Sequence, residues 1–142
     1  MRLRLLMIGK TRRPELRAVF DDYVKRISRS APIEVNELRD AEAALRRLEA
    51  DRAATAILLD AAGKPLDSEA LARWLAEQRE RGTREVIFLC GDADGFPELL
   101  RKRVAQKLSL SPMTYSHELA RVMLAEQLYR AFAILSGSPY PK

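Results

Sequence analysis

The feature that most constrains this chain is the alternation of short apolar runs with segments of helical periodicity. The apolar runs have the length and aliphatic character of strands, and they cover 3–9, 33–38, 55–60 and 85–91, with a shorter piece at 108–110. Between them, cap and stop residues bound the helical segments 14–28, 40–52 and 67–82, followed by helices at about 97–106 and 117–135. Strands that alternate with helices predict an α/β fold with a mostly parallel sheet flanked by helices.

Length and cysteine content limit the number of domains and the kinds of site that this chain can form. The 142 residues are enough for one compact core, so we expect a single domain over 1–142. Cys90 is the only cysteine and His117 the only histidine, which makes a Cys/His metal site improbable, and we expect no bound metal. No apolar run approaches the roughly 20 residues that cross a bilayer, and Arg2 and Arg4 interrupt the first run. We therefore expect a cytoplasmic protein without a membrane segment.

Positive charge is concentrated near the start of the chain. Residues 1–30 carry nine basic and three acidic side chains, a local charge of +6, while the remaining residues sum to −1. The basic residues are Arg2, Arg4, Lys10, Arg12, Arg13, Arg17, Lys25, Arg26 and Arg29. A second group consists of Arg101, Lys102, Arg103 and Lys107. Such clusters indicate either a surface that binds a polyanion such as RNA or a solvated helix face.

Two glycine-containing loops are expected to lie at the edge of the sheet where ligands bind. In open parallel sheets this edge is formed by the carboxyl ends of the strands, here the loops after Asp60 and Gly91. Gly63, Gly91 and Gly95 allow either close approach of a ligand or ordinary turns. The segment GKT at 9–11 lacks the upstream glycine of a phosphate-binding loop, and CGDADG does not fit the dinucleotide pattern. An enzyme for a small phosphorylated metabolite is therefore disfavoured.

The last predicted helix is apolar around most of its circumference. Its polar positions form two opposed pairs, His117 with Arg121 and Glu126 with Arg130. A small protein has little core with which to cover such a helix on two sides. We expect one face to pack on the sheet and another, with Leu124 and Leu128, on a second copy of the chain, and the alternative is a central helix in a monomer.

Three segments carry a resemblance to a known family: FLCGDADG, LSLSPMTYSHELARVMLAEQLYRA and the terminal SPY. The chain resembles the small bacterial SPOUT-class methyltransferases typified by ribosomal RNA large subunit methyltransferase H. The resemblance implies a SPOUT-type fold with a C-terminal deep trefoil knot, a homodimer formed through the C-terminal helix, and S-adenosylmethionine as cofactor. It also implies methylation of N3 of a pseudouridine in 23S rRNA of assembled ribosomes.

The resemblance also implies the site residues. The cofactor pocket is expected to include Leu59, Asp60, Gly91, Asp92, Leu110, Ser111, Pro112, Met113, Thr114, Tyr115 and Ser116. His117, Arg121 and Tyr140 are the candidate catalytic residues. Histidine exchanges protons near neutral pH, so His117 either acts directly on the acceptor or organises the loop by hydrogen bonding. Arg121 and Arg130 either face phosphates or the base, or form ion pairs, for instance Arg130 with Glu126.

The chain departs from the family pattern in two places. Asp92 replaces a second glycine, and Pro141 and Lys142 replace a histidine followed by a basic residue. Pro141 restricts Tyr140 to extended backbone conformations, so we expect the Tyr140 ring to serve as a stacking platform for the nucleotide, and Pro141→His to be tolerated. The alternative to an active enzyme is a catalytically weakened RNA- or ribosome-binding relative of the same fold.

Overall fold

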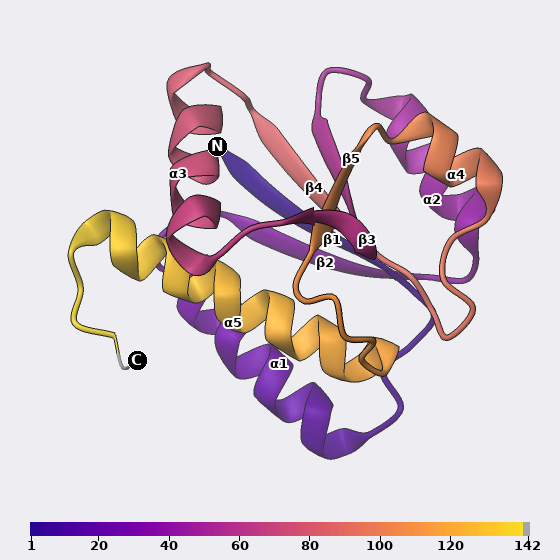
Figure 1. The fold of residues 1–142 in the computed structure, drawn as a ribbon, viewed down its shortest axis with the longest axis horizontal. Coiled ribbons are helices and arrows are strands. Elements are labelled where there is room, and N and C mark those ends of the chain that lie inside the picture. The colour runs from indigo at the N-terminus through magenta and orange to yellow at the C-terminus, as the bar shows by residue number, and fades with distance from the viewer. Residues whose placement is uncertain (141–142) are drawn as a thin grey trace.

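Five strands and five helices alternate along the chain in the computed structural model, which describes residues 1–140 (Figure 1). The strands are β1 (Arg2–Ile8), β2 (Ile33–Leu38), β3 (Thr55–Pro65), β4 (Glu85–Cys90) and β5 (Gln106–Ser109). The helices are α1 (Pro14–Ile27), α2 (Ala41–Ala50), α3 (Ser68–Glu80), α4 (Glu98–Arg103) and α5 (His117–Ser136). The alternation that the sequence predicts is confirmed.

All strand pairs are parallel, in the order β2-β1-β4-β3-β5. Parallel strands must be covered on both faces, and β4 is accordingly buried from Val86 to Cys90. Because the strands run in one direction, the segments that follow β3, β4 and β5 leave the sheet at the same edge. This edge is where the candidate site lies.

The helices form one layer on each face of the sheet. Helices α1, α3 and α5 pack on one face, around a core that includes Phe88 of β4 and Leu75 of α3. Helices α2 and α4 lie together on the other face (Figure 1), where Leu48 and Leu100 belong to one buried cluster with Ile87 and Leu89 of β4. The α/β fold with a parallel sheet flanked by helices is thus confirmed.

Strand β3 is longer than the sequence pattern indicates. The prediction ended it at residue 60, but it continues to Pro65 through an irregularity between Leu59 and Lys64 and pairs again with β5. A Cβ atom added to Gly63 would lie 2.7 Å from the backbone of Lys107, so glycine is needed there for strand contact. The prediction that Gly63 lies in a loop, either for close approach of a ligand or as part of an ordinary turn, is wrong.

Helix α5 packs between the sheet and two other helices, α1 and α3. Leu124 and Leu128 are fully buried within the single chain, so the interpretation that they face a second copy is wrong. The apolar residues of α5 that stay exposed are Leu119, Ile134 and Leu135. Dimerisation itself stays a prediction, and an interface on α5 has these exposed residues and the half-buried Val122 and Met123 available to it.

Among residues 1–140, no helix combines the length and apolar character needed to cross a membrane. Within the same residues, no three side chains of metal-ligating type gather into a group.

Candidate functional site

A cavity of about 370 Å³ opens at the carboxyl edge of the sheet. Its walls come from the end of β3, the loop 91–96 after β4, and the segment from Leu110 to the first turn of α5. Every residue predicted for cofactor binding lines it except Pro112. His117 and Ala120 of α5 close one side. The volume falls in the range of small-molecule pockets.

Arg101 belongs to the pocket wall although the sequence did not indicate it. Its Nη1 donates to Asp60 Oδ2 at 2.5 Å, and its Nε donates to the Phe96 carbonyl at 3.3 Å. The Asp60 side chain is 10% exposed, so this contact is shielded from water. The pair joins β3 to the loop after β4 and balances the charge of Asp60 inside the pocket. The position of Arg101 in α4, just after the loop, was the feature of the sequence that could have placed it at the pocket.

The second basic group is engaged with the chain's own acceptors. Arg103 forms an ion pair with Glu49 at 2.8 Å, and Lys107 donates to the carbonyls of Arg101 and Val104. Lys102 is exposed and lies 4.0 Å from Glu98. This group therefore stabilises α4 and its surroundings more than it provides a face for a polyanion.

The loop after β4 is a tight turn whose glycines serve the turn itself. Asp92 Oδ1 accepts from the Asp94 N–H at 2.9 Å, and the Gly95 N–H donates to the Asp92 carbonyl at 3.0 Å. Gly95 has φ of +78°, which favours glycine, and a Cβ on Gly91 would lie 3.0 Å from the Gly95 carbonyl oxygen. The ordinary turn explanation for these glycines is confirmed. The Asp92 carboxylate is used within its own loop.

Serine side chains shape the loop before α5. Ser109 Oγ donates to the Ser111 carbonyl, Ser111 Oγ accepts from the Met113 N–H at 3.0 Å, and Ser116 Oγ caps α5 by accepting from Leu119. Within residues 1–140, the N–H groups of Thr114 and Tyr115 donate no hydrogen bond. These two donors remain available to a ligand in the cavity.

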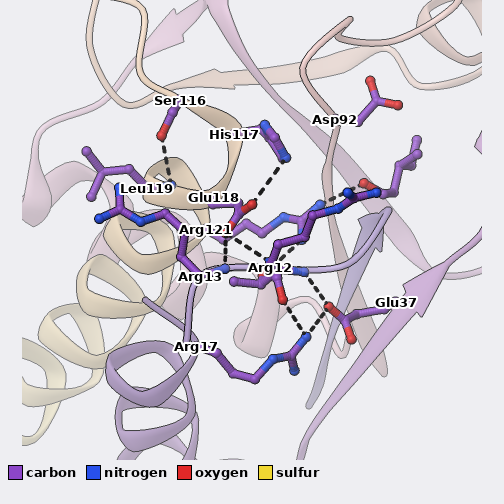
Figure 2. Close-up of polar contacts among 12 residues, drawn as sticks. Arg12, Arg13, Arg17, Glu37, Asp92, Ser116, His117, Glu118, Leu119 and Arg121 are labelled. Atoms are coloured by element: carbon purple, nitrogen blue, oxygen red, sulfur yellow. Dashed lines mark hydrogen bonds and ion pairs between the residues drawn. The ribbon is translucent and has the colours of Figure 1, made fainter. Parts of the chain in front are cut away.

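The first turns of α5 contact the segment between β1 and α1 (Figure 2). Glu118 Oε1 accepts from the N–H groups of Arg12 and Arg13, each at 3.0 Å, and its Oε2 lies 4.0 Å from His117 Nε2. The hydrogen bonds from Arg13 and Arg12 lower the pKa of Glu118, which keeps the carboxylate ionised. Glu118 is a residue that the sequence did not single out, since an acidic residue in a first helical turn is common.

Arg121 lies behind the pocket wall and is 1% exposed. Its Nη2 donates to the Ile8 carbonyl at 2.7 Å and its Nη1 to Thr11 Oγ1 at 3.0 Å, while burial lowers its pKa. Its Nε has no hydrogen-bond partner among residues 1–140. In this chain Arg121 thus anchors the end of β1, and its guanidinium does not line the pocket where a substrate base would enter.

Three exposed cations lie in the segment that Glu118 holds: Lys10, Arg12 and Arg13, which we call the basic loop. Arg17, which the sequence grouped with them, instead pairs with Glu37 at 2.8 Å and donates to the Thr11 carbonyl (Figure 2). The basic loop therefore lies beside the first turn of α5. Within residues 1–140, its cations form no ion pair with a buried side chain.

Comparison with known proteins identifies the fold and family. Residues 1–141 match the family model described as "Predicted SPOUT methyltransferase". The chain belongs to this family. Proteins named ribosomal RNA large subunit methyltransferase H from Pelobacter propionicus and Koribacter versatilis are 43% and 40% identical to it, each over 99% of this chain and 99% and 97% of their own lengths. The tRNA (m1G37) methyltransferase structure from Aquifex aeolicus has a TM-score of 0.61 at 17% identity, covering all of this chain and 74% of that one.

Tyr140, the third candidate catalytic residue, lies far from the pocket of its own chain. Its ring packs edge-on against Tyr129 at 4.7 Å, and its hydroxyl donates to Glu126 at 2.9 Å. Burial and hydrogen bonds with the Tyr23 hydroxyl, at 3.2 Å, and with Glu126 raise the pKa of Tyr140, so it stays a neutral phenol. Arg130 forms an ion pair with Glu126 at 2.6 Å, which confirms the ion-pair alternative for Arg130. The predicted effect of Pro141 and Lys142 lies outside the described residues.

Cys90 also lines the pocket of this SPOUT methyltransferase, and the residue is 2% exposed. Burial raises the pKa of Cys90 to about 12, so the thiol stays protonated at neutral and moderately alkaline pH. We expect the native protein to react with Ellman's reagent far more slowly than the urea-unfolded chain, with little acceleration up to about pH 9, because an unfolded thiol ionises near pH 8.5. Equal rates for native and unfolded protein would contradict burial of this thiol.

Proposed function

We propose that this chain is an S-adenosylmethionine-dependent methyltransferase that methylates N3 of a pseudouridine in 23S rRNA of assembled ribosomes. The observation that carries the proposal is a ligand-sized pocket, lined by the expected family residues, with an exposed basic loop anchored beside it. The relatives named ribosomal RNA large subunit methyltransferase H support the substrate class. Ribosomes as substrate imply action in the cytoplasm, and we treat 1–142 as one catalytic domain.

The donor set of the pocket fits the cofactor. Leu59, Leu110 and Met113 provide apolar walls for an adenine ring, and the free N–H groups of Thr114 and Tyr115 can donate to its edge. Arg101 offers a cation beside Asp60 for a carboxylate of the ligand. S-adenosylmethionine would supply a methyl group on a positively charged sulfur. The protein's part is to hold this group in line with the acceptor nitrogen and to exclude water.

Methylation also requires a group that takes the proton from N3 of the pseudouridine. His117 lines the pocket with its side chain 29% exposed, and the Glu118 carboxylate lies 4.0 Å from its Nε2. We assign to His117 the role of receiving the proton that leaves N3 as the methyl group arrives. The carboxylate of Glu118 stabilises the imidazolium that results.

A homodimer would complete the part of the site that holds the acceptor nucleotide. Helix α5 has 20 residues and is about 30 Å long, with the pocket at its first turn and Tyr140 beyond its last. Tyr140 therefore serves the pocket of a partner copy if it serves any. Two α5 helices in antiparallel contact through exposed residues such as Ile134 and Leu135 would bring each Tyr140 toward the partner's pocket. Family membership likewise supports the proposal that the C-terminal segment threads a deep trefoil knot.

Subunit mixing tests the shared site. His117→Asn and Tyr140→Ala proteins should each be inactive on ribosomes but bind S-adenosylmethionine normally. If they are unfolded and refolded together, half of the dimers are mixed, and each mixed dimer has one intact site. We expect about a quarter of wild-type activity to return, from statistical pairing in a two-fold dimer. No recovery from subunits that demonstrably exchange would contradict a site shared between two chains.

Two measurements test the function itself. Calorimetry should detect saturable binding of S-adenosylmethionine, and its absence would remove the methyltransferase proposal. Mass mapping of 23S rRNA from cells with and without the gene should show loss of a single methyl group on a pseudouridine. If the cofactor binds but the rRNA mass is unchanged, the chain is the catalytically weakened ribosome-binding relative.

A further inference from the structure

Glu118 directs its side chain away from the cofactor pocket and toward the basic loop. The residue is 9% exposed, and one of its oxygens accepts both backbone N–H groups, those of Arg12 and Arg13 (Figure 2). These groups precede α1, and the structure gives the helix no side-chain cap at Arg13. A residue more than 100 positions away thus satisfies donors at the start of α1.

Arg121 holds the other part of the same segment. It lies one turn after His117 in α5 and donates to the Ile8 carbonyl and the Thr11 hydroxyl from a fully buried position. Together, Glu118 and Arg121 bind four atoms of the segment 8–13, and these contacts hold the segment in place. None of these contacts neutralises Lys10, and Glu118 binds the main chain of Arg12 and Arg13, so their guanidinium groups remain at the surface.

We infer that Glu118 is a positioning residue for the RNA substrate: it holds the basic loop at a fixed distance from the pocket through the main chain of Arg12 and Arg13. The inference rests on the proposed function. His117, the neighbour of Glu118, forms part of the pocket wall, so one helical turn connects the cations that would bind phosphates to the place where the base reacts. Phosphate contacts set the register of a nucleic acid on a protein, and register decides which nucleotide reaches the site.

Arg13→Pro and Arg13→Ala form a matched pair that tests this contact from the loop side. Both remove the cation, but only proline also removes the N–H that donates to Glu118, and the backbone at Arg13 (φ −81°, ψ 115°) accommodates proline. We expect ribosome binding by the proline variant to be about tenfold weaker than by the alanine variant, because one charge-assisted hydrogen bond is lost. Both should bind S-adenosylmethionine like the wild type. Equal ribosome affinities would overturn the inference.

Glu118→Ala and Glu118→Gln test the same contact from α5. Glutamine keeps an oxygen that accepts from the loop but loses the charge beside His117, so its kcat should fall while its KM for ribosomes stays near the wild-type value. Alanine should in addition raise KM about tenfold and flatten the salt dependence of binding. Asp67→Ala is the matched control, because Asp67 Oδ1 accepts a backbone N–H at 2.7 Å at the start of α3, outside the pocket and the basic loop. A Glu118→Ala protein with wild-type KM and salt dependence would refute positioning while leaving the function intact. A wild-type protein that fails to bind ribosomes would instead refute the proposed function.

Discussion

Replacing Leu128 by aspartate is expected to unfold this protein and not to separate two folded subunits. Leu128 is fully buried within one chain, in the core that α5 shares with the sheet, α1 and α3. Removal of a buried leucine costs about 2–5 kcal/mol, and an unpaired buried carboxylate adds to that cost. The sum, at least about 4 kcal/mol, approaches the whole stability of a typical domain. Urea denaturation followed by circular dichroism measures the change.

Ile134→Asp is the matched control on the same helix. Ile134 is 41% exposed in the single chain, so its replacement should change the free energy of unfolding by less than about 1 kcal/mol. If the dimer uses the exposed apolar residues of α5, this variant should elute as a folded monomer. A folded Leu128→Asp protein with wild-type stability would show that the core is assigned incorrectly.

Reversing the three charges of the basic loop should produce the largest loss of ribosome binding. Lys10, Arg12 and Arg13 have exposed side chains. Within residues 1–140 their one ion pair, Arg13 with Glu15 at 4.0 Å, is itself exposed, so glutamates there should leave the fold intact. Each lost phosphate contact lowers the slope of log affinity against log salt by about 0.7–0.9. We expect ribosome affinity to fall by about 100-fold or more and the slope to fall by about 2–3.

The matched control reverses three exposed arginines on or just after α3, namely Arg73, Arg81 and Arg84. The net charge changes equally, but Arg81 and Arg84 lie near the start of β4, at the opposite edge of the sheet from the pocket. If both triple variants lose ribosome affinity to the same degree, net charge and not the basic loop would explain binding.

The order of strands and helices was predictable because buried parallel strands form continuous apolar runs. The end of β3 was not, since the segment from Asp60 to Pro65 has the glycine, proline and aspartate typical of turns. Pairing with β5 keeps this segment extended. The tertiary contact overrides the local preference, and only the structure contains that contact.

The pocket loops were predictable from the rule for parallel sheets and from the family resemblance, but the partners of charged side chains were not. Arg121 was expected to face a phosphate or the substrate base, or to form an ion pair. The structure buries it, since the Ile8 carbonyl and Thr11 accept its protons. The pair of Arg101 with Asp60 and the contact of Glu118 with Arg12 likewise join residues distant in sequence, and sequence alone does not specify such pairs.

The anchoring of the basic loop by α5 also has a consequence for the order in which the protein folds. The hydrogen bonds of Glu118 and Arg121 to the loop connect residues 105 to 113 positions apart, so their formation must close most of the chain into one loop. Contacts of such long range form late, because chain entropy opposes them until other contacts have formed. During synthesis on a ribosome the basic loop emerges first and stays unanchored until α5 has left the exit tunnel and docked. A chain truncated before α5 would lack both the pocket wall and a fixed basic loop.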